Sequence, residues 1–262
     1  MAPVTFGLLH PGEMGAAVGA VLRGRGHPVL WAAAGRSPES RKRAEEAGLD
    51  DAGSPEELVR RSEVILSICP PHAALEVAGA VAGFRGVYVD ANAISPATAR
   101  EVEAVLATGG GNCVDGGIIG PPPRAAETTR LYLSGAEAGL VAGLFSGSFV
   151  DARVLPGEVG TASAVKMAYA AWTKGTAALL LAIGELARAE GVEGELHEEW
   201  RLSLPELPER SDRALRSARV KGWRWVGEME EIASTFDAAG LPAGFHRAAA
   251  EVFRTSTGTR AR

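Results

Sequence analysis

The sequence contains little that would mark a disulfide-rich, metal-binding or cysteine-dependent protein. Its 262 residues include only two cysteines, Cys69 and Cys113, which are too few for a disulfide framework or a cysteine zinc site. The five histidines are scattered, and His197 in "LHEEW" has no second ligand at metal-binding spacing. We therefore expect no metal, and the low cysteine content suits a reducing, cytoplasmic environment.

An excess of positive charge and long apolar runs are also lacking. The net charge of -5 gives no reason to expect nucleic acid or an anionic membrane as a partner. No basic region precedes a long apolar stretch near the start, where the first apolar run, "VTFGLL", has the length of a strand. We expect neither a signal peptide nor a membrane span.

Short apolar runs alternate with helix-forming stretches from residue 4 to about 155. Runs rich in Val, Ile and Leu, separated by stretches rich in Ala, Glu and Arg, are typical of βαβ units around a parallel sheet. Three helix starts are predicted where serine can cap a helix and proline can occupy its first position, at Ser37-Pro38, Ser54-Pro55 and Ser95-Pro96. Seven strands are predicted: "VTFGLL", "PVLWAA", "EVILSI", "GVYVDA", "NCVDGG", "TRLYLSG" and "SFVDARVL".

The composition changes at about Gly157. No later segment has a convincing strand pattern, and residues 158–190 predict one long helix rich in Ala and Leu. Such an apolar helix needs cover from later helices or from a second subunit. Further helices follow, with a break at residues 240–242. The sequence thus predicts an α/β domain of residues 1–156, with a doubly wound parallel sheet, and an all-α domain of residues 157–262, joined by the long helix.

The turn after the first predicted strand has the pattern of a dinucleotide site. It is made of His10, Pro11, Gly12, Glu13, Met14 and Gly15. Gly12 stands where the backbone must approach a pyrophosphate, and Gly15 where helix and strand must pack closely. His10 replaces the usual first glycine, which is compatible with binding if His10 needs no positive φ. The alternative is that the glycines only pack a helix on a sheet.

The end of the second predicted strand lacks the acidic residue that NAD sites place there. In the segment "LWAAAGRSPESRKR" no Asp or Glu precedes Glu39, whereas Arg36 and Ser37 lie where NADP sites bind the 2′-phosphate. We therefore predict that NADP(H) is the cofactor. Lys42 is interpreted as part of an exposed helix face, and this alternative stays open for Arg41 and Arg43.

Four motifs in order along the chain resemble those of one superfamily. The segments "FGLLHPGEMG", "VDANAISP", "VDGGIIGPPP" and "GTASAVKMAYA" resemble motifs of the β-hydroxyacid dehydrogenases, which include 6-phosphogluconate dehydrogenase and 3-hydroxyisobutyrate dehydrogenase. The resemblance implies a Rossmann domain, a helical domain for substrate binding and dimerisation, and hydride transfer between nicotinamide and a small carbonyl or hydroxy substrate. It also implies a homodimer, to which the long helix points as well.

The resemblance also implies catalytic residues. Lys166 matches the family's lysine, which assists proton transfer at the substrate oxygen; the alternative is a lysine at a helix edge whose amine reaches water. Tyr169, on the same predicted helix face, can donate a proton or hold a substrate oxygen, or can be a core aromatic. Asn92 matches a serine of the family and can supply an amide near nicotinamide and substrate.

The remaining expectations concern the walls of the site. Cys69 and Pro70 complete the expected cofactor-binding residues. The expected substrate-binding residues are Gly117, Ile118, Ile119, Thr173 and Trp223. Thr173 replaces a glutamate of 6-phosphogluconate dehydrogenase, which disfavours oxidative decarboxylation of a sugar acid. Ile119 and Pro121 replace a serine and a glycine, so we expect a more apolar pocket, completed by Trp172, Trp223 or Trp225 unless these belong to the core.

Two functions besides a dehydrogenase or reductase stay open. Imine reductases share the architecture but commonly have Asp or Tyr at the position of Lys166, and a non-catalytic NADP(H)-binding protein could use redox state as a signal. A basic stretch can bind an anionic substrate or form a solvated helix face. It contains Arg210, Arg213, Arg216, Arg219, Lys221 and Arg224.

Overall fold

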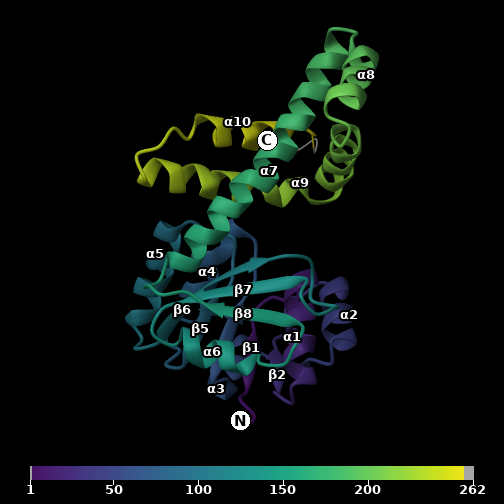
Figure 1. Cartoon of the computed structure of the whole chain (residues 1–262). Coiled ribbons are helices and arrows are strands. Elements are labelled where there is room, and N and C mark those ends of the chain that lie inside the picture. Colours follow the sequence, from purple (N-terminus) through teal and green to yellow (C-terminus); the bar gives the residue numbers. More distant parts are fainter. Residues whose placement is uncertain (1, 257–262) are drawn as a thin grey trace. The chain divides into compact units, whose positions relative to one another are not determined.

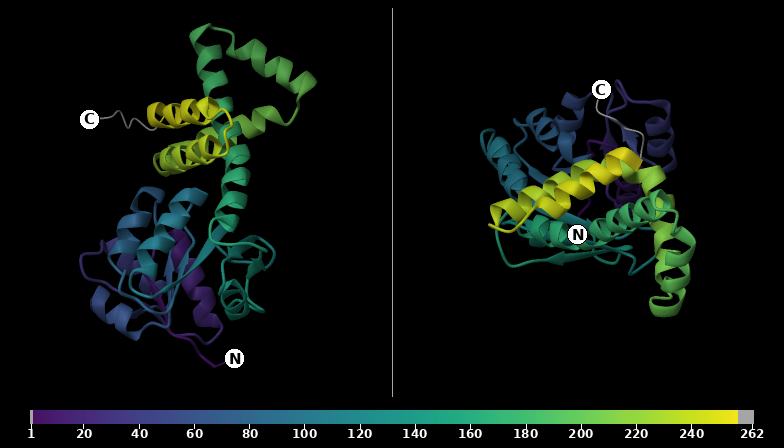
Figure 2. Two further views of the ribbon diagram at one scale, coloured as in Figure 1. Left: turned by 90° about the vertical axis from the view of Figure 1, so that its left-hand side faces the viewer. Right: turned by 90° about the horizontal axis from the view of Figure 1, so that it is seen from above.

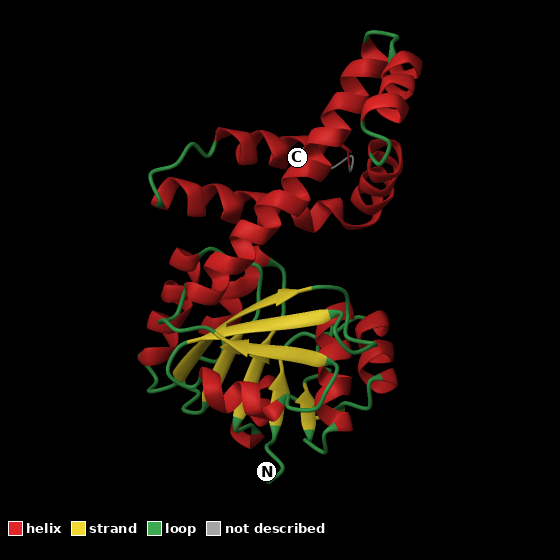
Figure 3. Cartoon of the chain, in the orientation of Figure 1, coloured by secondary structure: helices red, strands yellow, loops and turns green. Residues whose placement is uncertain are grey.

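The structure, a computed structural model, describes residues 2–256. It divides between Lys166 and Met167 into two compact units. The first is α/β and the second is helical, as Figures 1 and 3 show. The fold class predicted from the sequence is therefore confirmed, while the predicted domain boundary after residue 156 stays a prediction.

One sheet organises the N-terminal unit. Its strands follow the order β3-β2-β1-β4-β5-β6-β7-β8. They are β1 (Phe6–Leu8), β2 (Val29–Trp31), β3 (Asp50–Asp51), β4 (Val64–Ser67), β5 (Val87–Asp90), β6 (Asn112–Ile119), β7 (Thr129–Ser134) and β8 (Val150–Val154). The chain turns from β1 to β2 on one side and later returns to β4 on the other. Ligands of such sheets bind where the strand order reverses in this way.

The sheet departs from the prediction in two places. β7 runs antiparallel to β6, and β8 is parallel to β7. Residues 120–128, which join β6 to β7, contain no helix, and a connection without a crossover returns the chain antiparallel. β3 was not predicted, because its two residues are exposed aspartates with no apolar pattern.

Serine capping positions three helices as predicted. Ser37 Oγ accepts a hydrogen bond from Ser40 N at 3.3 Å, and the Ser54 and Ser95 side chains cap their helices in the same way. The helices of this unit before residue 160 are α1 (Glu13–Gly24), α2 (Pro38–Glu46), α3 (Pro55–Arg61), the short 3-10 helix η1 (Pro71–Ala73), α4 (Ala74–Gly79), α5 (Pro96–Ala107) and α6 (Ala138–Leu144).

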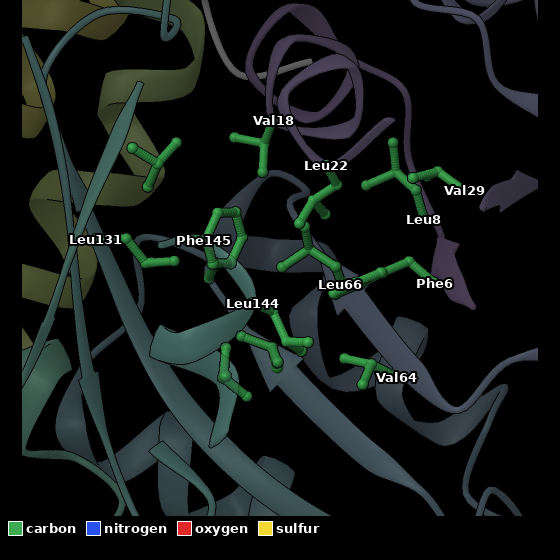
Figure 4. Close-up of a cluster of buried hydrophobic side chains, with 14 of the residues drawn as sticks. Phe6, Leu8, Val18, Leu22, Val29, Val64, Leu66, Leu131, Leu144 and Phe145 are labelled. Atoms are coloured by element: carbon green, nitrogen blue, oxygen red, sulfur yellow. The ribbon is translucent and has the colours of Figure 1, made fainter. Parts of the chain in front are cut away.

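Apolar side chains fill both faces of the sheet. Figure 4 shows one cluster, in which Phe6 and Leu66 from neighbouring strands lie with Leu22 of α1 and Phe145. A second cluster contains Ile65, whose side chain alternates with that of Leu66 along β4. Burial on both faces is the property that makes these strands near-continuous apolar runs in the sequence.

Four helices follow in the C-terminal part: α7 (Thr161–Ala189), α8 (Glu193–Ser203), α9 (Leu207–Ala238) and α10 (Gly244–Ser256). The predicted long helix and the predicted break at residues 240–242 are both confirmed. A largely buried ion pair joins α7 to α9, with Lys174 Nζ 2.6 Å from Glu228 Oε2. Figures 1 and 2 both show α10 lying along α9. Within residues 2–256, no helix combines the length and the apolar character needed to cross a membrane.

Candidate functional site

The turn between β1 and α1 leaves its middle glycine open. A Cβ atom on Gly12 would meet nothing within 4 Å, whereas one on Gly15 would lie 2.3 Å from His10 O. Gly15 thus allows α1 to lie against the turn, and no side chain caps the first amides of α1. Among the described residues other than glycine, a positive φ occurs only at Glu127, so His10 meets the condition set from the sequence.

His10 brings an unpartnered buried nitrogen to this turn. Its Nδ1 atom is buried and has no hydrogen-bond partner in the described structure. Burial, and secondarily the positive charge of Arg36, lower the pKa of His10 to about 4. The imidazole is therefore neutral at pH 7, and its free nitrogen is available to a ligand that covers the turn.

Three arginines surround the ends of β1 and β2. Arg36 donates to Leu9 O at 2.9 Å, Arg41 to Ala33 O at 2.7 Å and Arg43 to Pro11 O at 3.1 Å. The contact of Arg43 with the turn was left open by the sequence, because it depends on how α2 lies against the glycine turn. Lys42 instead pairs with Glu46 at 3.8 Å on the surface, in agreement with the prediction that it belongs to an exposed helix face.

An acidic side chain also reaches the end of β2. Asp51 Oδ1 accepts from Ala33 N at 3.2 Å and from Gly53 N at 2.8 Å, so it is engaged with the backbone. Ser37 stands on the other side, where it caps α2 and lies at the positive end of that helix. The sequence missed Asp51 because β3 itself was not predicted.

Asn92 joins the ends of β4 and β5. Its Oδ1 atom accepts from Cys69 N at 2.6 Å, while Nδ2 donates to Ser67 Oγ at 3.1 Å and to Asp90 Oδ2 at 2.9 Å. Both amide hydrogens are thus donated to acceptors inside the protein. The expected donation from Asn92 to a ligand stays a prediction, and it requires the amide to give up its bond to Ser67 or to Asp90.

Cys69 and Pro70 follow β4, which pairs directly with β1. The strand pairing brings this segment to the same edge of the sheet as the glycine turn. Burial, together with the nearby charge of Asp90, raises the pKa of the Cys69 thiol to about 12. Cys69 is therefore a protonated thiol and not a nucleophile at neutral pH.

Lys166 lies against β6 near the start of α7. Its Nζ atom donates to Ile118 O at 2.7 Å. Gly117 makes the close approach possible, because a Cβ there would lie 2.9 Å from Ala162 O and 3.1 Å from Lys166 Cβ. The amine is thereby held at the residues that the sequence assigned to substrate binding.

A buried carboxylate, Asp115, fixes the start of the same helix. Asp115 Oδ2 accepts from Gly160 N and Ser163 N, each at 2.9 Å, and from Ser134 Oγ at 3.2 Å. Asp115 is 1% exposed. Sequence reasoning did not assign it a role, although it stands in the "VDGGIIG" motif directly before the two glycines.

The other predicted site residues belong to the C-terminal unit. Tyr169 and Trp223 are 46% and 55% exposed, and Trp172 is exposed as well. The alternative that these aromatics are core residues is therefore wrong for the described chain. Thr173 donates its hydroxyl hydrogen within α7, to Tyr169 O at 3.3 Å. Across residues 2–256 no group of three His, Cys, Asp or Glu side chains is placed to hold a metal ion.

Comparison with known families assigns both parts of the chain. Residues 5–143 match the NAD binding domain of 6-phosphogluconate dehydrogenase. Residues 187–256 match a domain of unknown function, DUF1932. A curated relative is an uncharacterised 28.5 kDa protein of Methanothermus fervidus, 31% identical over 165 residues, which are 63% of this chain and 63% of that protein. The match therefore spans less than two thirds of that relative's length.

Solved structures share the fold over nearly the whole chain. A conserved protein of unknown function, described as similar to 3-hydroxyacid dehydrogenases, is 28% identical with a TM-score of 0.70 over 98% of both chains. A Mycobacterium tuberculosis 3-hydroxyisobutyrate dehydrogenase gives a TM-score of 0.74 at 19% identity, over 99% of this chain and 96% of that one. A reductive aminase of Aspergillus terreus in complex with NADPH gives 0.61 at 19% identity, over 98% and 95%.

Proposed function

The chain belongs to the family that carries the NAD binding domain of 6-phosphogluconate dehydrogenase, and on that basis we propose that it is an NADP(H)-dependent oxidoreductase. Its substrate is a small carbonyl compound or the corresponding alcohol. The observation that carries the proposal is the position of Lys166, whose amine is held 2.7 Å from Ile118 O in the same unit as the glycine turn.

The residues around the turn fit a dinucleotide phosphate. Gly12 faces open space, the first amides of α1 have no capping side chain, and His10 has an unpartnered buried nitrogen. These groups would hold the pyrophosphate, and the positive end of α1 favours its charge. The guanidinium groups of Arg36 and Arg43, with the hydroxyl of Ser37, favour a 2′-phosphate over a free hydroxyl.

Lys166 would move a proton at the substrate oxygen. A bound nicotinamide supplies or accepts the hydride at the substrate carbon. In reduction the ammonium group of Lys166 donates a proton to the oxygen of the carbonyl, and in oxidation the neutral amine accepts it. Ile118 O fixes the amine in either state, because both the charged and the neutral amine carry an N–H donor.

The walls beside Lys166 favour a compact, partly apolar substrate. Gly117 lets α7 pack closely on β6, and the neighbouring side chains of Ile118 and Ile119 are apolar and buried. A charged sugar acid would find no partner in these side chains. Thr173, where 6-phosphogluconate dehydrogenase has a glutamate, supports the same conclusion.

Imine reduction is the second candidate. The likeness to a reductive aminase solved with NADPH supports it, as does the exposed phenol of Tyr169, three residues after Lys166. The lysine itself favours oxygen chemistry, because imine reductases commonly have Asp or Tyr at its position.

We also propose a homodimer. Large apolar side chains are exposed on α7 and α9, including Leu179 at 46%, Leu186 at 62% and Val220 at 70%. Exposed apolar side chains that gather on helices favour contact with another protein surface. A second copy of this chain is the partner that the family resemblance favours.

A substrate screen tests the proposed function. Purified protein with NADPH is offered panels of aldehydes, ketones and imines, and with NADP⁺ a panel of alcohols, while NADPH absorbance is followed. Turnover of a carbonyl or alcohol, but not of imines, supports the proposal. Saturable NADPH binding without turnover in any panel would instead favour a cofactor-binding sensor.

A further inference from the structure

A cavity is lined by residues of the C-terminal unit alone, among them Thr173, which the sequence assigned to substrate binding. It lies between α7 and α9 and has a volume of about 290 Å³. Ala177, Leu180 and Ala214 form its apolar floor, and Leu180 and Ala214 belong to a buried cluster of this unit. Its volume is just below the range of roughly 300–1,000 Å³ typical of ligand sites, so an occupant must be small.

The rim of this cavity is cationic. Arg210 and Arg213, one turn apart on α9, both line it. Arg213 pairs with Glu209 at 2.9 Å, whereas Arg210 has no carboxylate partner in the described part of the chain. The hydroxyl group of Ser217 adds a further hydrogen-bond donor to the wall. A guanidinium group beside an apolar floor is suited to a carboxylate or a phosphate.

Two indole rings complete the walls. Trp172 of α7 is 64% exposed, whereas Trp225 of α9 is half-buried and meets the ring of Phe253 edge-on at 5.1 Å between centroids. Indole faces bind apolar or aromatic groups of a ligand. Because the rings are rigid, the tryptophan side chains lose little conformational entropy on binding.

We propose that this cavity binds a small organic anion, with its carboxylate or phosphate on Arg210 and its apolar body between the two indoles. Arg210 favours this occupant, because its guanidinium group has no carboxylate partner in the described part of the chain and a small anion would supply one. Trp and Arg are also common at protein interfaces, so contact with a second copy of the chain is one outcome of the test. The site lies wholly in the C-terminal unit and does not depend on the proposed oxidoreductase activity.

The basic stretch of α9 supplies a matched control. Arg216 is exposed and does not line the cavity, although it carries the same charge on the same helix. Loss of Arg210 therefore tests local recognition, and loss of Arg216 tests general attraction between a basic helix and an anion.

The experiment titrates the full-length protein, without nucleotide, with phenylacetate, phenyl phosphate and the neutral benzyl alcohol. Tryptophan fluorescence reports binding, because Trp172 and Trp225 line the cavity, and calorimetry provides an independent measurement. We expect saturable binding of an anionic probe, with benzyl alcohol and the Arg210→Gln variant each weaker by about tenfold or more. Arg216→Gln should bind like the parent protein. The two anionic probes show whether a carboxylate or a phosphate is preferred.

Three outcomes would overturn the proposal. Benzyl alcohol binding as well as the anions would mean that the cavity is only an apolar surface. Equal weakening by Arg210→Gln and Arg216→Gln would mean that the attraction is diffuse. Absence of probe binding, with Trp172 protected from quenchers in a stable dimer, would mean that the cavity is an interface between copies. Because no nucleotide is used, each of these results leaves the oxidoreductase proposal standing.

Discussion

Asp115 accepts two hydrogen bonds from Ser163, one from its amide at 2.9 Å and one from its hydroxyl at 2.6 Å. Both side chains are buried, at 1% and 0% exposure. The carboxylate thus caps the first turn of the helix that carries Lys166, three residues further on. Asp115 acts as a positioning residue for the lysine, because it joins the strand beneath the amine to the start of the helix.

Removal of this carboxylate is expected to destabilise the protein. Asp115→Ala leaves the amides of Gly160 and Ser163 without their acceptor, which should lower the free energy of unfolding by about 3 kcal/mol. Ser163→Ala removes one hydroxyl partner and should cost only about 1 kcal/mol. Urea unfolding of the three proteins measures both values. A loss below about 0.5 kcal/mol for Asp115→Ala would show that the cap contributes little.

Arg36 is expected to determine the preference for NADPH. Arg36→Ala removes the guanidinium group that we propose contacts the 2′-phosphate and should raise the Kd of NADPH by roughly 10–150-fold, with NADH binding nearly unchanged. Lys42→Ala removes a surface charge from the same segment and is the control. Calorimetric titration measures the constants. Equal affinities of the parent protein for NADH and NADPH would contradict the cofactor assignment.

Lys166 is expected to affect turnover and not cofactor binding. Lys166→Met keeps the length of the side chain and removes the amine, so turnover of a substrate found in the screen should fall by about 10²–10⁴-fold. Tyr169→Phe and the double variant show whether the two residues act as a unit. Unaltered turnover in Lys166→Met, measured with saturating NADPH, would move the proton-transfer role to another residue.

Acidification is expected to destabilise the protein through His10. Burial, and secondarily the charge of Arg36, lower the pKa of His10 from its usual 6.5 to about 4 in the folded protein. Between these values the unfolded chain binds more protons, so the free energy of unfolding falls as the pH drops through this window, by about 1–3 kcal/mol. Below about pH 4 this contribution levels off.

Comparison with His10→Asn isolates this contribution. Burial also lowers the pKa of His246 in the C-terminal unit, which adds a pH dependence of the same sign. The difference between the parent protein and His10→Asn, followed by urea unfolding from about pH 7 to about pH 4, should shrink as the pH falls. If the difference in the free energy of unfolding between the two proteins does not change with pH, His10 does not cause the acid destabilisation.

The exposed apolar side chains of α7 and α9 predict a stable homodimer. Permanent interfaces between identical chains commonly bury roughly 2,000 Å² or more and are rich in apolar groups. Leu186→Glu places a charge on this surface and should increase the monomer fraction, whereas Leu202→Glu, on α8, tests a different exposed apolar residue. Sedimentation velocity at micromolar concentration measures the oligomeric state. A monomeric parent protein would contradict the dimer.

Local rules predicted much of the fold. Serine and proline at residues 37–38, 54–55 and 95–96 determine helix starts through bonds that span three residues, and all three caps form. The helix over residues 161–189 follows from composition alone. β3 escaped prediction because its pairing with β2, and not its two aspartates, makes it a strand.

Contacts between distant elements were harder to predict. The bond from Arg43 to Pro11 O depends on where α2 lies on the glycine turn. Asp115 looked like one more residue of a strand, because its partners Gly160 and Ser163 lie far along the chain. The cavity beside Arg210 exists only because α7 and α9 pack together, although the basic stretch was visible in the sequence.

The spacing of residues along β6 and along α7 determines where the amine of Lys166 lies. Asp115 joins β6 to α7 at Ser163. From there the strand advances about 3.3 Å per residue to Ile118 and the helix about 1.5 Å per residue to Lys166, and these two spacings bring the amine to Ile118 O. A single deletion between Asp115 and Ile118 would turn every later side chain of the strand to the opposite face. An insertion between Ser163 and Lys166 would swing the amine about 100° around the helix axis. The spacing of these residues along the chain therefore constrains the position of the amine, in addition to their chemical identity.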